Sequence, residues 1–254
     1  MFINIFKYIL VIFYYIYLCV FFPLVLLPVY FIAQICKFFG LIYQNDQIHI
    51  WNWFVYYGFM YPLDVSYNIS GAFINEGFIL ANHRTFCDFA YDPYVSNSII
   101  ISRSLAAFSI FFASIIAILD NKIIIIDRTK SRQIIFDQII NFMKKFNEPK
   151  RILFFPEGTR RSHTKLTLEE TKTIIKPGLL KSIYEYKKLP VQIMMSSNKE
   201  KVFNEKKLSI NIGETIYTQL SAPIDPADYK SFDEFLEEIH SEWHRIFCLL
   251  YKEN

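Results

Sequence analysis

Residues 152–160, ILFFPEGTR, place an apolar run of strand length directly before a turn that carries a carboxylate, a glycine and an arginine. Residues 78–88, FILANHRTFCD, follow the same plan, with a histidine and an aspartate after the apolar run. Further runs of strand length lie at residues 123–126, 191–195 and 208–212. Helical patterns separate these runs, and alternating strands and helices are typical of parallel sheets. We therefore predict an α/β domain with a mostly parallel sheet flanked by helices.

Residues 131–146 and 232–251 carry the clearest helical patterns, with apolar side chains along one face and polar ones elsewhere. Residues 105–119 are apolar throughout but shorter than a helix that crosses a bilayer. We expect this run to form a buried helix or a second surface that dips into the membrane. No repeat or linker interrupts residues 63–254, which we interpret as one domain.

The N-terminal part of the chain is predicted to be a membrane anchor. Between Lys7 and Lys37 there is no charged residue, and this run exceeds the ~20 residues that cross a bilayer core. Pro23 and Pro28 disfavour one straight helix. Two interpretations of residues 1–37 stay open: a tilted span kinked near Pro23, and a re-entrant helical hairpin with both ends on one side.

Residues 38–62 are predicted to be an interfacial segment, because Trp and Tyr are enriched at lipid headgroups. We expect about half of these rings to fill the core of the following domain instead. The rings are those of Tyr43, Trp51, Trp53, Tyr56, Tyr57 and Tyr61. The four cysteines show no paired spacing, which indicates a reducing compartment. We therefore expect an integral membrane protein with its main domain facing the cytosol, in the endoplasmic reticulum if the source is eukaryotic.

His83 and Asp88 are candidates for a base and the carboxylate that orients it. Positions five apart lie ~140° around a helix and do not share a face. The pair therefore requires His83 on the turn after the strand and Asp88 in the first turn of a helix. Asp88 would then fix the tautomer of the ring and leave its other nitrogen to accept a proton from an alcohol. The alternative is that His83 only caps the helix and Asp88 is a surface residue.

The turn after residue 155 is a candidate anion site. Gly158 allows a tight turn, and Arg160 has the planar fork that binds phosphate bidentately. Glu157 would repel phosphate, so we expect it to hold an arginine or a substrate hydroxyl. Residues 123–128, IIIIDR, end a third strand with Arg128. If the sheet is parallel, these strand ends share its carboxyl edge, where open α/β sheets bind ligands.

In this order, NHRTFCD, IIIIDR and FPEGTR resemble the first three sequence blocks of the glycerolipid acyltransferase family, typified by 1-acylglycerol-3-phosphate acyltransferases. Residues 189–191 resemble the fourth block, and Lys176 with Gly178 resembles a Lys-Gly pair that follows the third. The resemblance covers residues 75–195 and implies a glycerol-3-phosphate acyltransferase-like fold. Arg84 makes the first block most similar to the lysocardiolipin acyltransferase and plant-type branches.

By this resemblance, His83 is the base that activates a glycerol hydroxyl for attack on an acyl-CoA thioester, and Asp88 orients it. The residues implied to bind the acceptor's phosphate and glycerol are Arg128, Glu157, Gly158, Thr159, Arg160 and Lys176. Acyl-CoA is a co-substrate, and no bound cofactor or metal is expected. The expected partners are the two substrates and membrane lipids, not nucleic acid. The oligomeric state stays open.

The acceptor also stays open, because two features depart from the family pattern. Asn121 and Lys122 replace a glycine before the second block, and residues 162–173 lengthen the path to Lys176. Lysophosphatidic acid is the leading acceptor, with lysocardiolipin or lysophosphatidylinositol as alternatives. A lipid-binding protein without catalysis is the alternative from another class. Acyl-chain length would depend on a tunnel, and we expect residues 105–119 to line it.

Overall fold

The computed structural model describes residues 9, 11–39, 49–104, 107, 111–127, 129–145, 150–161, 165–205, 207 and 209–251. These residues form a seven-stranded sheet in the order β1-β9-β6-β2-β5-β3-β4. Neighbouring strands run parallel except β6 and β9, which are antiparallel. The predicted α/β class and mostly parallel sheet are therefore confirmed. The strands are β1 Ser66–Ser70, β2 Gly77–Ala81, β3 Ile99–Arg103, β4 Ile123–Ile126, β5 Arg151–Phe154, β6 Val191–Ser197 and β9 Thr215–Leu220.

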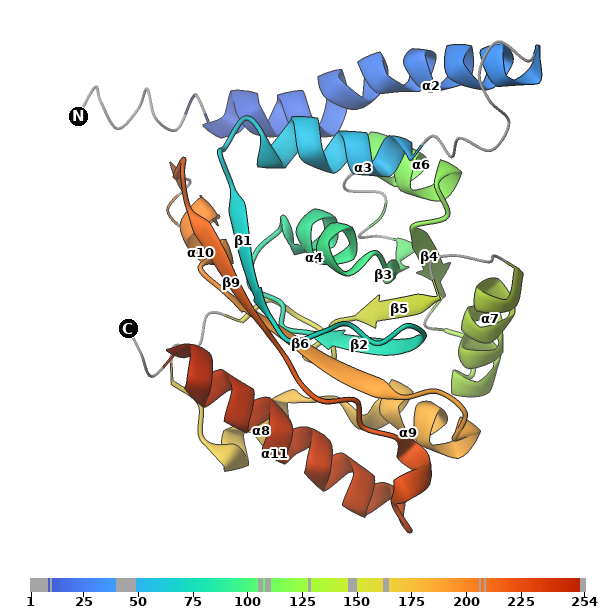
Figure 1. The fold of residues 1–254 in the computed structure, drawn as a ribbon, viewed down its shortest axis with the longest axis vertical. Coiled ribbons are helices and arrows are strands. Elements are labelled where there is room, and N and C mark those ends of the chain that lie inside the picture. The colour runs from blue at the N-terminus through green and yellow to red at the C-terminus, as the bar shows by residue number, and fades with distance from the viewer. Residues whose placement is uncertain are drawn as a thin grey trace.

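Helices cover both faces of this sheet (Figure 1). Side chains of a strand alternate between faces, so Phe78 and Leu80 of β2 pack into one core cluster and Ile79 and Ala81 into the other. The first cluster includes residues of α7 Arg132–Lys145, α8 Leu168–Ile174, α9 Pro177–Tyr186 and α11 Phe232–Tyr251. The second includes residues of α3 Ile50–Val55, η2 Tyr56–Met60, α4 Asp88–Ser96 and α6 Phe111–Leu119. The remaining short elements are α10 Lys199–Val202, η3 Pro226–Asp228 and the hairpin of β7 Phe203–Asn204 and β8 Ser209–Ile210.

Several predicted elements are confirmed, and one prediction was wrong. The predictions for β4 and α11 match the structure residue for residue, and α7 lies within the predicted residues 131–146. The run at residues 208–212 was predicted to join the main sheet, but it contributes β8 to the separate hairpin. The sheet position beside β6 is occupied by β9, which the sequence patterns did not indicate.

The N-terminal segment is helical from residue 11 to residue 38, with a π-helical turn, η1 Tyr17–Phe21, followed by α2 Phe22–Phe38. This turn directly precedes Pro23, so the helix accommodates the proline by a local change of winding instead of ending there. α2 packs against α3 and α6 (Figure 1). Among the described residues, we find no helix that has both the length and the apolar character needed to cross a bilayer.

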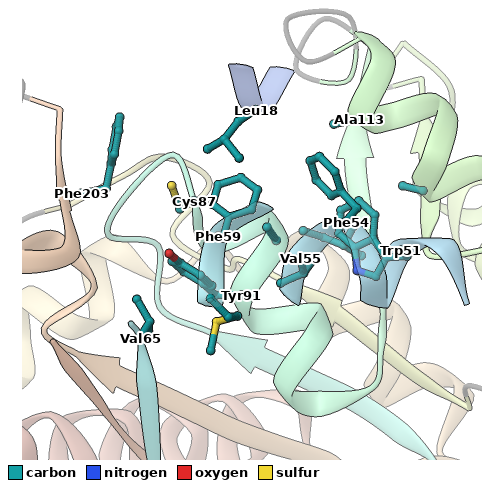
Figure 2. Packing of buried hydrophobic residues seen from close by; sticks show 14 of the residues in the cluster. Leu18, Trp51, Phe54, Val55, Phe59, Val65, Cys87, Tyr91, Ala113 and Phe203 are labelled. Carbon is teal, nitrogen blue, oxygen red and sulfur yellow. The ribbon is translucent and has the colours of Figure 1, made fainter. Parts of the chain in front are cut away.

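The segment at residues 38–62 divides between core and surface, but one of its five described Trp and Tyr rings is buried, fewer than the expected half. Trp51 is fully buried and packs with Phe54, which contacts Phe59, and Phe59 in turn contacts Tyr91 (Figure 2). Four other rings are exposed on the same segment, those of Trp53, Tyr56, Tyr57 and Tyr61. Tyr43 lies outside the described residues.

Candidate active site

His83 and Asp88 form a hydrogen-bonded pair at the carboxyl end of β2. The chain leaves the strand at Ala81, turns through residues 82–87, and begins α4 at Asp88. Nδ1 of His83 lies 2.9 Å from Oδ2 of Asp88. Asp88 is fully buried, so it is not a surface residue. The predicted placement, with the histidine on the turn and the aspartate in the first helical turn, is confirmed.

The turn itself holds the Asp88 carboxylate. The backbone N–H groups of Arg84 and Thr85 donate to Oδ2, the second at 2.9 Å, and the Thr85 hydroxyl donates to Oδ1 at 3.2 Å. Burial alone would raise the pKa of Asp88, but the Lys199 ammonium and the hydrogen bond to His83 lower it overall. Asp88 is therefore a carboxylate at neutral pH, and Nδ1–H of His83 donates a hydrogen bond to it. Nε2, on the other side of the ring, is left as the basic nitrogen.

Asn82 fixes this turn to the neighbouring strand. Its side-chain amide donates to the carbonyl of Ser196 at 2.9 Å and accepts from the Ser196 N–H at 2.8 Å. Both residues are buried, and Ser196 belongs to β6, which pairs with β2. The asparagine of the first sequence block thus anchors the residue before His83 to the sheet.

The His83 ring borders a cavity of about 650 Å³. The ring stacks on Phe155, with centroids 4.3 Å apart, and its side chain remains 22% exposed. The cavity has an apolar wall and a basic rim. The apolar wall contains Phe86, Phe89, Ile100, Ile101, Ile126, Ile135, Ile139, Phe154 and Leu179. The basic side chains are those of Arg103, Lys130, Arg132, Arg160 and Lys176.

Four of the predicted binding residues reach this cavity, three from the turn after β5 and Lys176 from the start of α9. Gly158, Thr159, Arg160 and Lys176 all line it. Gly158 has a φ of +69°, and a Cβ there would lie 2.6 Å from Nζ of Lys176. The left-handed backbone favours glycine here, and a larger residue would also displace the Lys176 side chain packed against it. The Arg160 guanidinium forms an ion pair with Glu205.

Of the predicted binding residues that the structure describes, Glu157 does not line the cavity. The Glu157 side chain is buried beside Arg84 and Arg161 in a small void, away from the cavity. Burial raises its pKa to about 7, although the charges of Arg84, Lys199 and Arg161 oppose the shift. Glu157 thus lies near arginines, as one of its two predicted roles required, and it does not line the cavity that a substrate hydroxyl would have to enter. Arg128 lies outside the described residues.

Arg84 also points away from the cavity. Its guanidinium lies 4.7 Å from the ring centroid of Tyr251 and 5.7 Å from that of Phe247, both on α11. It also donates to the carbonyl of Arg161 at 3.0 Å. Arg84, which made the first sequence block most similar to the lysocardiolipin acyltransferase branch, therefore joins the turn to the last helix and does not line the cavity.

The described part of the predicted run at residues 105–119 forms α6, which packs against α3 and the N-terminal helices. None of its described residues lines the cavity, so the expected lining of an acyl-chain tunnel is not seen in the part of this run that the structure describes. The apolar wall comes instead from β3, β4, β5, α7 and α9 and from Phe86 and Phe89 near the start of α4. Sequence patterns also gave no sign of Lys199, which is buried against Asp88, or of Glu205, which pairs with Arg160.

No protein-family model matches the sequence, and no curated protein matches it. A search of solved structures gives a match to the crystal structure of the 1-acyl-sn-glycerophosphate (LPA) acyltransferase PlsC from Thermotoga maritima. The match has a TM-score of 0.64 and 15% sequence identity, and it covers 97% of this chain and 95% of that one. The two chains share a fold. The similarity includes the N-terminal helices as well as the sheet, because nearly the whole chain is covered.

Proposed function

We propose that this protein is an acyltransferase that moves a fatty acyl group from acyl-CoA to the free hydroxyl of a lysophospholipid, with 1-acylglycerol-3-phosphate as the leading acceptor. The observation that carries the proposal is that the His83–Asp88 pair opens onto the same cavity as Arg160 and Lys176. A base beside two cations suits an alcohol that also carries a phosphate. The fold shared with a 1-acyl-sn-glycerophosphate acyltransferase supports the same reaction class.

In the proposed reaction, Nε2 of His83 takes the proton of the acceptor hydroxyl as its oxygen attacks the thioester carbonyl. Asp88 stabilises the imidazolium that forms. When the tetrahedral intermediate collapses, the carbon–sulfur bond breaks and the thiolate takes the proton back from His83. A new ester and free CoA thiol result, so protons and charge balance without a further group.

The acceptor phosphate is proposed to bind Arg160 and Lys176 at the rim, because guanidinium and ammonium groups are the usual phosphate partners in proteins. The apolar wall then suits the acyl chain of either substrate.

Lysocardiolipin and lysophosphatidylinositol remain alternative acceptors. Arg84, which suggested them, does not line the cavity, so we rank them below lysophosphatidic acid. A panel of these acceptors, assayed with one acyl-CoA, tests the ranking.

We also propose that the protein works at a membrane surface, with its main domain in the cytosol. The N-terminal helices expose a large apolar surface, which a soluble monomer rarely does. The most exposed apolar side chains there include Phe13, Phe21, Val25, Phe31, Ile32, Ile35 and Phe38. The cavity adjoins these helices, since Phe86 contacts Tyr15 and Phe89 contacts Trp51. A lipid acceptor therefore has a short path from this surface to His83.

The decisive experiment measures release of free CoA thiol with and without a lysophospholipid, for wild type and His83→Ala. Wild type should release thiol only when the acceptor is present, and H83A should be at least ~10²-fold slower, the low end for a positioned base. Circular dichroism and melting temperature serve as controls for folding. Wild-type turnover in folded H83A would contradict the assignment. Binding of lysophospholipid without any thiol release would favour the non-catalytic alternative.

A further inference from the structure

Lys199 is a fully buried lysine directly behind the His83–Asp88 pair. It begins α10, immediately after Asn198 turns the chain away from β6 with a φ of +68°. Its Nζ lies 2.9 Å from Oδ2 of Asp92, 3.4 Å from Oδ1 of Asp88 and 3.0 Å from the carbonyl oxygen of Asn82. One ammonium thus joins two carboxyl groups of α4 and the peptide that precedes His83.

Asp88 and Asp92 are both buried and share this single cation. A buried carboxylate is unfavourable unless it is paired or hydrogen-bonded. Asp88 has further donors in the turn, from Arg84, Thr85 and His83. Asp92 lacks these donors among its described contacts, and burial raises its pKa, as does the nearby Asp88 charge. When one of the two must hold a proton, it is therefore Asp92, and Asp88 stays ionised.

We propose that Lys199 is a positioning residue for the proposed acyl transfer: it keeps Asp88 in the ionised form that orients His83. The inference rests on the proposed function. Lys199 does not line the cavity and touches no substrate. It acts through Asp88, by offsetting the charge of the second carboxyl.

The test compares Lys199→Met, Asp92→Asn and the double variant K199M/D92N. In K199M, two buried carboxyl groups lie together without a cation, so one retains a proton, which can reside on Asp88. We expect kcat/KM near pH 7 to fall roughly tenfold or more, part of what a positioned base contributes. The acid limb of its pH profile should move to higher pH. D92N keeps the Lys199–Asp88 pair and should stay within about threefold of wild type, well short of that loss.

The double variant separates this role from a purely structural one. Removing Asp92 together with Lys199 leaves Asp88 with its turn donors and without a competing carboxyl. We expect K199M/D92N to recover most of the activity lost in K199M and to return the acid limb toward that of wild type. A loss of packing would make the double variant as poor as K199M or worse. Either that result or an unchanged rate and pH profile in folded K199M would overturn the proposal.

Thermal melts give a readout that needs no turnover. The shared proton in K199M is held with a raised pKa, so its stability should fall as pH rises from 5 to 9, relative to K199M/D92N. Parallel melting curves would overturn the inferred charge sharing.

If K199M does not fold, the double variant, which has one buried carboxyl fewer, is compared with D92N. Absence of activity in the double variant would then overturn the proposal. An inactive wild type would instead refute the proposed function, while the melts would still report the charge cluster.

Discussion

At the scale of single residues, the site depends on which side chains are buried together. The sequence NHRTFCD was sufficient to predict the His83–Asp88 pair, because the two residues are close in sequence: His83 lies on the turn and Asp88 begins the helix that follows. Lys199 could not be predicted in the same way. Its partner Asp92 is 107 positions away, and no local pattern indicates that a lysine is buried. Long-range charge pairs depend on the tertiary fold, which is why this part of the site was missed.

Glu157 provides a prediction at this scale. Its pKa in the folded protein is raised from 4.5 to about 7, mainly by burial. Between pH 4.5 and about 7, the native state therefore holds a proton that the unfolded chain has already lost. The free energy of unfolding that this proton contributes is fully present below pH 4.5 and is lost as pH rises through about 7. We expect Glu157→Gln to gain stability relative to wild type over this range. Melting temperatures of both proteins at several pH values from 4 to 8 measure the difference.

The comparison isolates Glu157, because the other buried carboxyls, Asp88 and Asp92, titrate in both proteins. A constant difference between the two melting curves across the whole range would show that Glu157 titrates like an exposed carboxyl.

At the scale of elements, the strongly patterned segments were predictable. A run of four isoleucines gave β4, and a long amphipathic period gave α11. Edge strand β1 and its neighbour β9 were missed because β1 is mostly exposed and β9 alternates with polar residues, so neither forms an apolar run. The run at residues 208–212 was apolar enough for a strand but pairs only within its hairpin. Apolar runs therefore revealed β2, β5 and β6 in the interior and β4 at the other edge, while β3, with only three isoleucines before a polar end, was also missed.

This β7–β8 hairpin links the two halves of the site. Glu205, which follows β7, accepts from the backbone N–H of Phe86 and pairs with Arg160. An acceptor phosphate must compete with this carboxylate for the guanidinium. We expect Glu205→Gln, which keeps the acceptor oxygen for Phe86, to lower the KM for the lysophospholipid by about two- to fivefold, the range for a half-exposed ion pair. Steady-state kinetics with varied acceptor give the value.

The matched variant is Arg160→Gln, which removes the cation itself and should raise the same KM. For both variants, kcat should change less than KM, because neither residue contacts the reacting hydroxyl in the proposed reaction. A higher KM in E205Q would mean that the carboxylate orients Arg160 for the phosphate instead of competing with it.

At the scale of the whole molecule, the two faces of the sheet differ in what covers them. α7, α8, α9 and α11 cover one face, while the other carries α4, α6 and the N-terminal helices with their exposed apolar side chains (Figure 1). This asymmetry is what a protein attached to a membrane on one side would need. The apolar run at the N-terminus predicted membrane contact, whereas the way its helices pack on α3 and α6 could be read only from the structure.

The membrane surface can be tested with Ile32→Glu/Ile35→Glu, since these side chains are 60% and 56% exposed on α2. Burial of an isoleucine in an apolar environment contributes roughly 1.5–3 kcal/mol, so their replacement by two charges should reduce binding to phospholipid vesicles at least about tenfold. Ile134→Glu is the matched control, because Ile134 is 52% exposed on α7, which covers the opposite face of the sheet. Vesicle flotation measures the bound fraction. Equal binding of the double variant and wild type would show that α2 does not contact the lipid, whereas an equal loss in I134E would indicate general repulsion by added negative charge.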